Sequence, residues 1–257
     1  MSGPNTLAIK IYADGADLEG MLAMYADPRI AGFTTNPTLM RKAGVADYET
    51  FARTVLDHIP DRPISFEVFA DELDEMERQA RQIATWGSNV NVKVPITNTL
   101  GEATLPVIRR LSADGICVNV TAVMTVAQVR AVAGCLDADC PAIVSVFAGR
   151  VADTGRDPVP HMQACLEELS GRPKAALLWA SPRELLNLFQ ADRIGCHIIT
   201  MTNDLLVKMA MIGKDLDAYS LETVKMFRTD AEAAGFVLHS GSAATDGVSG
   251  KKSRGDE

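Results

Sequence analysis

Short apolar runs rich in β-branched residues recur along the chain at a regular pitch, and stretches with helical periodicity separate them. Residues 71–86, for example, place apolar side chains among charged ones at the spacing of one helix face. A strand followed by a helix, repeated many times, is the pattern of a parallel sheet covered by helices. The eight runs are residues 7–13, 30–35, 64–70, 90–95, 115–121, 142–149, 175–181 and 196–202.

The number of these units predicts how the sheet closes. Eight strand–helix units in roughly 200 residues fit a (β/α)8 barrel, the TIM-barrel fold of the α/β class. The alternative is a doubly wound open sheet, but it normally uses fewer strands, and no GxGxxG motif follows the first run. We expect one domain over residues 1–236, with an additional amphipathic helix at 214–236 after the barrel. The Gly/Ser-rich residues 237–257 are expected to form a disordered tail.

Composition and charge limit the classes of function. The 257 residues are 47% hydrophobic but only 5% aromatic, which suits helices packed on a parallel sheet. A net charge of -8 gives no support for binding to nucleic acid or to an anionic membrane, whereas small anionic substrates remain compatible with it. Neither a secretory signal nor an apolar run long enough to span a bilayer is evident, so the cytoplasm is the expected compartment.

A lysine interrupts one of the strand runs. In "NVNVKVPIT", residues 89–97, Lys93 follows Val92 in a stretch of alternating β-branched residues. Burial disfavours the charged form of an amine, so a lysine here either reaches water, pairs with a carboxylate or acts as an amine nucleophile. Judged alone, the stretch favours a structural lysine. Glu67 interrupts the run 64–70 in the same way, and a buried Glu67–Lys93 ion pair is therefore a second structural alternative.

Polar residues stand at the ends of other strand runs as well. In a (β/α)8 barrel the active site is built at the carboxyl ends of the strands, so these side chains are expected to converge on one rim. Together with Glu67 and Lys93, the set consists of Asp14, Asn36, Asn119, Thr121, Ser145, Arg150, Ser181 and Arg183.

Each of these residues also has a structural explanation. Asp14 could cap the helix that follows it, and Asn36 precedes a proline, so an Asn-Pro turn explains it without catalysis. Ser181 opens "SPRE", which has the spacing of a capping box with the serine as N-cap. Asn119 and Thr121 could satisfy backbone groups in the next loop.

Taken as a set, the strand-end residues indicate a particular chemistry. A lysine, two carboxylates, amides, hydroxyls and two arginines suit amine catalysis on a phosphorylated carbonyl compound. A metal site is not expected, because the four histidines are scattered without paired ligand spacing. No GxSxG motif indicates a serine nucleophile.

Around these residues the chain resembles the transaldolase family, class I Schiff-base enzymes of (β/α)8 fold. The resemblance extends from about residue 7 to about residue 236, and six segments carry it in the same order. They are "GFTTNPTL" at 32–39, "VNVKVPIT" at 90–97, "VNVTAVMT" at 118–125, "VFAGRVAD" at 146–153, "LLWASPRE" at 177–184 and "GCHIITMTNDLL" at 195–206.

The resemblance implies a role for each catalytic position. Lys93 matches the Schiff-base lysine, and Glu67 matches the carboxylate that works with a water in proton shuttling. Thr121 matches the threonine that helps to hold that water. Asp14 matches the acid/base that exchanges a proton with the C4 hydroxyl during carbon–carbon cleavage.

The resemblance also implies the substrates. Asn36, Asn119 and Ser145 match residues that bind the dihydroxyacetone hydroxyls, and a second set, Arg150, Ser181 and Arg183, matches the phosphate-binding residues. The implied reaction transfers a dihydroxyacetone unit from sedoheptulose 7-phosphate or fructose 6-phosphate to glyceraldehyde 3-phosphate or erythrose 4-phosphate. It belongs to the non-oxidative pentose phosphate pathway and needs no metal or organic cofactor. Family members are commonly oligomeric, so a homo-oligomer is expected.

Two other functions stay open. The fructose-6-phosphate aldolase subgroup shares the fold but typically carries glutamine at the position of Glu67 and tyrosine at that of Phe147, so these two residues favour a transaldolase, with Phe147 among the substrate-binding residues. One segment departs from the family pattern: "DGAD" at 14–17 has Gly where the family commonly has Thr or Ser after the aspartate. This change removes no catalytic residue but could reshape the acceptor side of the site. A non-catalytic sugar-phosphate-binding protein is the third alternative, but it predicts loss of the lysine–carboxylate set.

Overall fold

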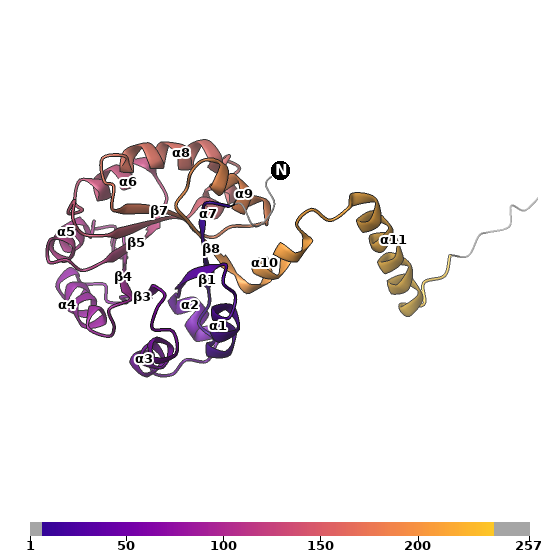
Figure 1. Ribbon diagram of the computed structural model, residues 1–257, viewed down its shortest axis with the longest axis horizontal. Coiled ribbons are helices and arrows are strands. Elements are labelled where there is room, and N and C mark those ends of the chain that lie inside the picture. Colours follow the sequence, from indigo (N-terminus) through magenta and orange to yellow (C-terminus); the bar gives the residue numbers. More distant parts are fainter. Residues whose placement is uncertain (1–6, 239–257) are drawn as a thin grey trace, which may run out of the picture. The chain divides into compact units, whose positions relative to one another are not determined.

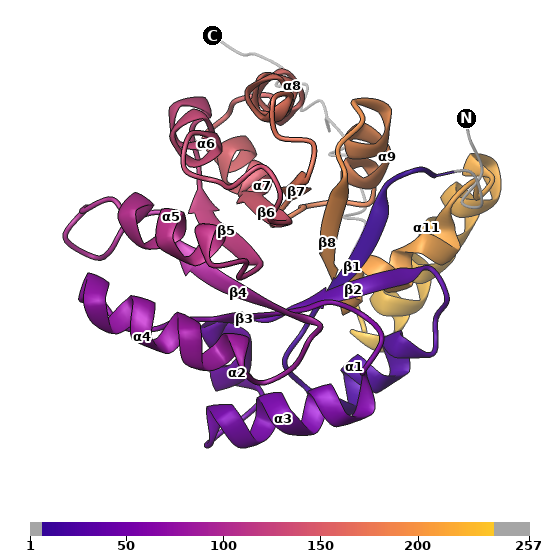
Figure 2. The same cartoon turned by 60° about the vertical axis from the view of Figure 1, so that its left-hand side comes forward.

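Eight parallel strands close into a barrel in which each strand pairs with its neighbours in sequence and β1 pairs with β8. The structure is a computed structural model that describes residues 7–238; Figure 1 shows the strands inside a ring of helices, and Figure 2 labels all eight strands. The predicted (β/α)8 barrel is confirmed, and the open doubly wound sheet is excluded by the closed order. The strands are β1 (Lys10–Asp14), β2 (Ile30–Thr34), β3 (Ile64–Glu67), β4 (Val90–Pro95), β5 (Val118–Val123), β6 (Ala142–Val146), β7 (Ala175–Trp179) and β8 (Ile198–Thr202).

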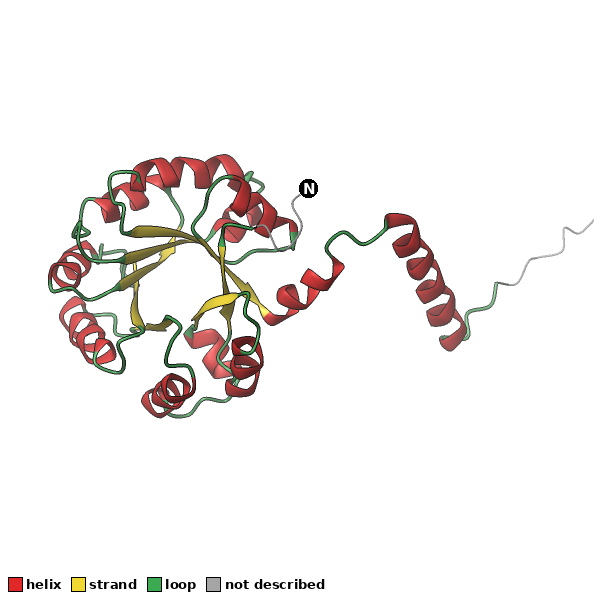
Figure 3. Ribbon diagram, in the orientation of Figure 1, coloured by secondary structure: helices red, strands yellow, loops and turns green. Residues whose placement is uncertain are grey.

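Helices enclose the barrel, as Figure 3 shows by colour and Figure 2 from a second direction. Their apolar faces follow the sequence pattern: α4 buries Met76, Ala80 and Ile83, while its charged residues are half-buried or exposed. The helices that accompany the barrel strands are α1 (Leu18–Tyr25), α2 (Pro37–Lys42), α3 (Tyr48–His58), α4 (Leu73–Ala84), α5 (Leu105–Ala113), α6 (Val126–Ala133), α7 (Ala148–Asp153), α8 (Pro158–Leu169), α9 (Leu186–Arg193), α10 (Asn203–Val207) and the 3-10 helix η2 (Lys208–Met211).

Alternation along the strands sorts side chains between the helix layer and the barrel interior. Ile11 packs into the large core under the helices, whereas Tyr12 belongs to a separate apolar cluster that also contains Ile198. Two residues further along the same two strands come Asp14 and Thr200, which line a cavity. A polar layer therefore lies above an apolar one, at the carboxyl ends of the strands.

A second compact unit begins at Gly213 and contains α11 (Leu216–Ala233). Asp215 caps this helix by accepting a hydrogen bond from the Ala218 N–H at 2.8 Å. The helix predicted at 214–236 is thus present, while its membership in the barrel domain stays a prediction. Of the tail predicted to be disordered, residues 239–257 lie outside the described residues. Within residues 7–238 no helix is long and apolar enough to cross a membrane.

Candidate active site

Lys93 lies in the barrel interior with its amine almost completely buried. The side chain is 7% exposed, and its Nζ is 3.0 Å from Glu67 Oε2 and donates a hydrogen bond to the Thr35 carbonyl oxygen at 2.8 Å. The strand register explains the pairing, because Glu67 on β3 lies directly opposite Lys93 on β4. The ion pair proposed from sequence is present. Since desolvating two charges offsets much of their attraction, stability alone does not explain it.

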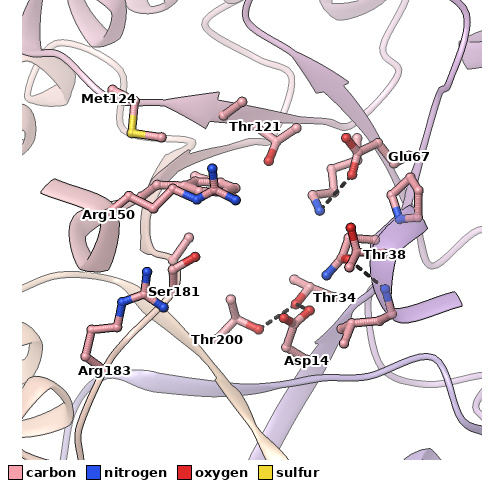
Figure 4. A pocket seen from close by; sticks show the side chains of 18 residues that line it. Asp14, Thr34, Thr38, Glu67, Thr121, Met124, Arg150, Ser181, Arg183 and Thr200 are labelled. Carbon is pink, nitrogen blue, oxygen red and sulfur yellow. Dashed lines mark hydrogen bonds and ion pairs between the residues drawn. The ribbon is translucent and has the colours of Figure 1, made fainter. Parts of the chain in front are cut away.

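A cavity of about 620 Å³ opens above this ion pair at the carboxyl ends of the strands. Ten of the eleven residues predicted from sequence line it, and Asn119 is the exception. Figure 4 shows the carboxylates on one side of the cavity and the two arginines on the other. The lining residues from the predicted set are Asp14, Asn36, Glu67, Lys93, Thr121, Ser145, Phe147, Arg150, Ser181 and Arg183.

Thr121 carries a buried hydroxyl with no hydrogen-bond partner among the described residues. It lies on β5 opposite Pro95, one strand away from Lys93. The next residue, Ala122, has a left-handed backbone with φ of 59°, and the pairing of β5 with β6 shifts register here. A non-glycine residue in this region costs of order 1 kcal/mol, and such strain is concentrated at functional sites. An unpartnered hydroxyl facing a cavity is available to a ligand or a water.

Asp14, at the end of β1, is half-buried and receives a hydrogen bond from the Thr34 hydroxyl at 2.8 Å. Burial raises the pKa of Asp14 above its ordinary value, and the Lys93 charge and the Thr34 hydrogen bond act against that rise. A carboxyl tuned in this way can exchange a proton closer to neutral pH. The capping role considered for Asp14 is wrong, because Asp17 caps α1 through the Gly20 N–H at 2.7 Å.

Two amides differ in where the structure places them. Asn36 caps α2, since its Oδ1 accepts a hydrogen bond from the Leu39 N–H at 3.0 Å, and its side chain also lines the cavity. The local role of Asn36 is thus that of a helix N-cap with Pro37 as the first helical residue rather than the Asn-Pro turn considered from sequence, and Asn36 still lines the site. Asn119 lies below the cavity, where it donates to Ser65 Oγ at 3.0 Å and accepts from Ser145 Oγ at 2.6 Å. Asn119 orients Ser145 in this arrangement, and among the described residues its side chain bonds these two serines and no backbone group of the next loop.

The arginine side of the cavity is built by a close approach of α7 to the end of β7. A Cβ on Gly149 would lie 1.6 Å from the Ser181 carbonyl oxygen, so only glycine fits there. Ser181 itself has a left-handed backbone with φ of 55°. The capping box expected in "SPRE" is wrong: α9 begins at Leu186, and its N-cap residue makes no side-chain cap hydrogen bond.

The guanidinium groups of this wall are held by neighbouring side chains. Arg183 donates through Nε to Asp153 Oδ1 at 3.0 Å and forms an ion pair with the same carboxylate through Nη2. Arg150 lies with its Cζ 5.5 Å from the centre of the Phe147 ring. Two arginines on one wall give this acidic protein a local cationic surface that suits an anionic group of a ligand.

Sequence reasoning missed Thr200 of β8, which is 6% exposed and lines the cavity. Its Oγ1 lies 2.5 Å from the Thr34 Oγ1. The sequence did contain a signal for Thr200: it is a hydroxyl residue within the apolar run "CHIITMT". A buried hydroxyl needs a hydrogen-bond partner, so this position pointed to a polar contact inside the barrel. In the part of the chain that the structure describes, no group of three or more His, Cys, Asp or Glu side chains is arranged to hold a metal ion.

The fold and this cavity define a (β/α)8-barrel protein with a buried lysine–carboxylate pair facing an arginine wall. A family model described as Transaldolase/Fructose-6-phosphate aldolase matches residues 11–238. The chain belongs to this family.

Curated relatives agree with that assignment. A protein named "Probable transaldolase" from Dehalococcoides mccartyi is 32% identical over 204 residues, which cover 78% of this chain and 90% of that protein. A "Probable transaldolase" from Streptococcus equi subsp. zooepidemicus is 34% identical, with coverage of 78% and 90%. "Probable transaldolase 2" from Listeria monocytogenes is 33% identical, with coverage of 78% and 88%.

Solved structures share the fold at low identity. The 3-hexulose-6-phosphate synthase of Salmonella typhimurium has a TM-score of 0.52 and 16% identity, and the match covers 76% of this chain and 89% of that one. A likeness at this level of identity shows the fold alone.

Proposed function

We propose that this protein is a transaldolase that transfers a dihydroxyacetone unit between sugar phosphates through a Schiff base on Lys93. The observation that carries the proposal is the buried Lys93 Nζ, 3.0 Å from Glu67 Oε2, beneath a cavity with two arginines on its far wall. The donor would be sedoheptulose 7-phosphate or fructose 6-phosphate, and the acceptor glyceraldehyde 3-phosphate or erythrose 4-phosphate. Such a reaction serves the non-oxidative pentose phosphate pathway in the cytoplasm.

The first step is formation of the Schiff base. Glu67, whose Oε2 is 3.0 Å from the Lys93 Nζ, would take a proton from the Lys93 ammonium and leave a neutral amine to attack the C2 ketone. The resulting carbinolamine loses its hydroxyl as water, and this step needs a proton donor at the oxygen. The free hydroxyl of Thr121 supports a role in holding the water through which Glu67 would return that proton.

The second step is cleavage of the C3–C4 bond. Asp14 accepts the proton of the C4 hydroxyl, the bond electrons move into the iminium, and the aldose phosphate leaves. The three-carbon enamine stays on Lys93, and an acceptor aldehyde adds to it by the reverse steps. The iminium supplies the electron sink, so the proposed chemistry needs no metal or organic cofactor. The raised pKa of Asp14 supports its role as the group that alternates between the two protonation states.

The remaining residues are proposed to orient the substrate. Ser145 and Asn36 face the cavity and suit the hydroxyls of the dihydroxyacetone unit, while Asn119 acts through its hydrogen bond from Ser145. Arg150, Ser181 and Arg183 are proposed to bind the phosphate, since planar guanidinium donors match phosphate oxygens, and Phe147 packs beside Arg150.

Borohydride trapping with fructose 6-phosphate, followed by peptide mass mapping, tests the proposal. The expected result is a stable three-carbon adduct on Lys93, which is absent from the Lys93→Met variant. Lys174→Met is the matched control, because Lys174 lies half-exposed and pairs with Asp139. An adduct on another residue would contradict the role of Lys93, and no adduct at all would favour a non-catalytic sugar-phosphate-binding protein.

A fructose-6-phosphate aldolase activity is the second candidate, because the matched family model includes both activities. Glu67 and Phe147 favour the transferase. Release of glyceraldehyde 3-phosphate from fructose 6-phosphate is measured with and without erythrose 4-phosphate. A transaldolase releases it rapidly only when the acceptor is present, whereas equal rates in both conditions would identify the aldolase.

We also propose that the protein assembles into a homo-oligomer. Considered by itself, α11 has no buried residue, and Leu221, Val224 and Phe227 on it are more than half exposed. Contiguous exposed apolar side chains mark interaction surfaces in soluble proteins. Light scattering coupled to gel filtration is expected to give a multiple of the 27.6 kDa chain mass. A monomer mass at micromolar concentration would contradict the proposal.

A further inference from the structure

Two threonine hydroxyls form a chain that ends on Asp14. Thr34 lies opposite Asp14 in the pairing of β2 with β1, and its Oγ1 is 2.8 Å from Asp14 Oδ1. Thr200, on the other side of β1 in β8, places its Oγ1 2.5 Å from the Thr34 Oγ1. Both threonines are buried, and Figure 4 shows Thr34 between Thr200 and Asp14. Three neighbouring strands thus contribute one group each to a single line of hydrogen bonds.

The number of hydrogens fixes the direction of this chain. A threonine hydroxyl has a single hydrogen to donate, and an ionised carboxylate can only accept. Thr34 therefore donates to Asp14 when Asp14 is ionised, and the hydrogen between the two threonines must come from Thr200. The order is Thr200 to Thr34 to Asp14 Oδ1. The second carboxylate oxygen of Asp14, Oδ2, takes no part in this line of hydrogen bonds.

We propose that Thr200 is a positioning residue that acts on Asp14 through Thr34 and keeps the carboxylate oriented for proton exchange with the substrate. The inference rests on the proposed role of Asp14 as the acid/base. Hydrogen bonds in a chain polarise one another, so the Thr200 donor strengthens the bond that Thr34 makes to Asp14. It also holds the Thr34 hydroxyl in the rotamer that points at Oδ1.

Several charged groups influence the pKa of Asp14, and some of their effects oppose one another. Burial is the largest influence on the Asp14 pKa and raises it, the Lys93 charge on β4 lowers it, and the Glu67 charge on β3 raises it. The arginines at 150 and 183 line the same cavity on its opposite wall. Hydrogen bonds from Thr34 and Asn36 also lower the Asp14 pKa, and because Lys93 is itself paired with Glu67, the Thr34 donor that Thr200 supports is a neutral contribution that no carboxylate offsets.

Packing does not explain why β8 has a hydroxyl at this position. Valine has nearly the same shape as threonine, and the preceding residues of β8, Ile198 and Ile199, are apolar. A buried hydroxyl is unfavourable unless it is hydrogen-bonded, and within residues 7–238 the one side-chain partner of the Thr200 hydroxyl is Thr34. The Thr200→Val substitution therefore removes the donor and little else.

Titration of the Asp14 carboxyl carbon by 13C NMR, assigned with Asp14→Asn, tests the proposal without requiring activity. Thr200→Val is expected to raise the Asp14 pKa measurably, and Thr34→Val is expected to raise it further. Thr200→Ser keeps the hydroxyl and is expected to retain the wild-type titration. Thr202→Val is the matched control on the same strand, because the Thr202 hydroxyl donates to Asp204 and takes no part in the hydrogen bonds that lead to Asp14.

Transaldolase assays provide the second measurement. Thr200→Val is expected to reduce kcat about fivefold, the effect of one lost hydrogen bond, with KM for fructose 6-phosphate unchanged. The acidic limb of its pH–rate profile should shift to higher pH. Unchanged Asp14 titration in Thr200→Val, or equal effects of Thr200→Val and Thr200→Ser, would overturn the proposal. Failure of borohydride trapping in the wild type would instead refute the proposed function, and the NMR titration would still decide the role of Thr200.

Discussion

Replacing Gly149 with alanine tests whether the close approach of α7 to the end of β7 positions the phosphate end of the site. The added Cβ would lie 1.6 Å from the Ser181 carbonyl oxygen and 3.3 Å from Arg183 Nε. The oxygen belongs to the backbone, so no side-chain rotation relieves the contact. The two segments must separate by about 1.4 Å, the difference between 1.6 Å and the 3.0 Å below which such contacts are not found. Arg150, Ser181 and Arg183 would move with them.

The size of this displacement sets the expected effect. A misplacement of about 1 Å in a site costs about a hundredfold in rate, so kcat/KM for fructose 6-phosphate should fall by about that factor. Overpacking should also lower the free energy of unfolding by about 1 to 3 kcal/mol. For a chain of this size each kcal/mol corresponds to about 2 to 4 °C in Tm, so the variant remains folded at 25 °C.

Steady-state kinetics with fructose 6-phosphate and with unphosphorylated fructose separate the two effects. The loss of kcat/KM should be large for the phosphorylated substrate and small for fructose, because the Lys93 end of the cavity lies on other strands. Gly171→Ala is the control, since a Cβ there meets no atom within 4 Å. Equal losses for both substrates would show that the substitution disturbs the whole barrel, and wild-type kinetics would refute the positioning argument.

Arg183→Ala should raise KM for fructose 6-phosphate about 10- to 100-fold, the value of a charge-assisted hydrogen bond, and leave KM for dihydroxyacetone unchanged; equal rises would remove Arg183 from the phosphate site. Asp14→Asn should abolish transfer but raise Tm at neutral pH. Burial raises the pKa of Asp14, so its ionised form destabilises the folded protein. The gain in Tm should therefore vanish as the pH falls through the folded-state pKa of Asp14 toward the ordinary pKa of an aspartate. A gain that grows in acid would contradict this. Thr121→Val should change the free energy of unfolding by less than about 0.5 kcal/mol, since the hydroxyl has no hydrogen-bond partner among residues 7–238. It should nevertheless slow formation of the borohydride-trappable iminium by about tenfold or more; an unchanged trapping rate would exclude Thr121 from that step.

Much of the fold and part of the site could be predicted from local sequence patterns. The alternation of "NVNVKVPIT" predicted β4, and strand counting predicted the barrel and the rim on which Lys93 and Glu67 lie. These predictions succeeded because the side-chain period of a strand is a local property. The predicted capping box at Ser181 failed for a complementary reason: the chain there takes its conformation from contact with Gly149, which is remote in sequence.

The sequence by itself determined the eight strand–helix units, the apolar layers and the identity of the polar residues at the strand ends, because hydrophobic periodicity encodes them locally. Only the tertiary structure decided which of those residues interact. Closure of β8 onto β1 brings Thr200 to Thr34 and Asp14, and the pairing of β5 with β6 shifts register beside Thr121, whose hydroxyl has no hydrogen-bond partner among the described residues. Such contacts join segments far apart in the chain, and barrel closure sets their distances, so no local pattern in the sequence reports them.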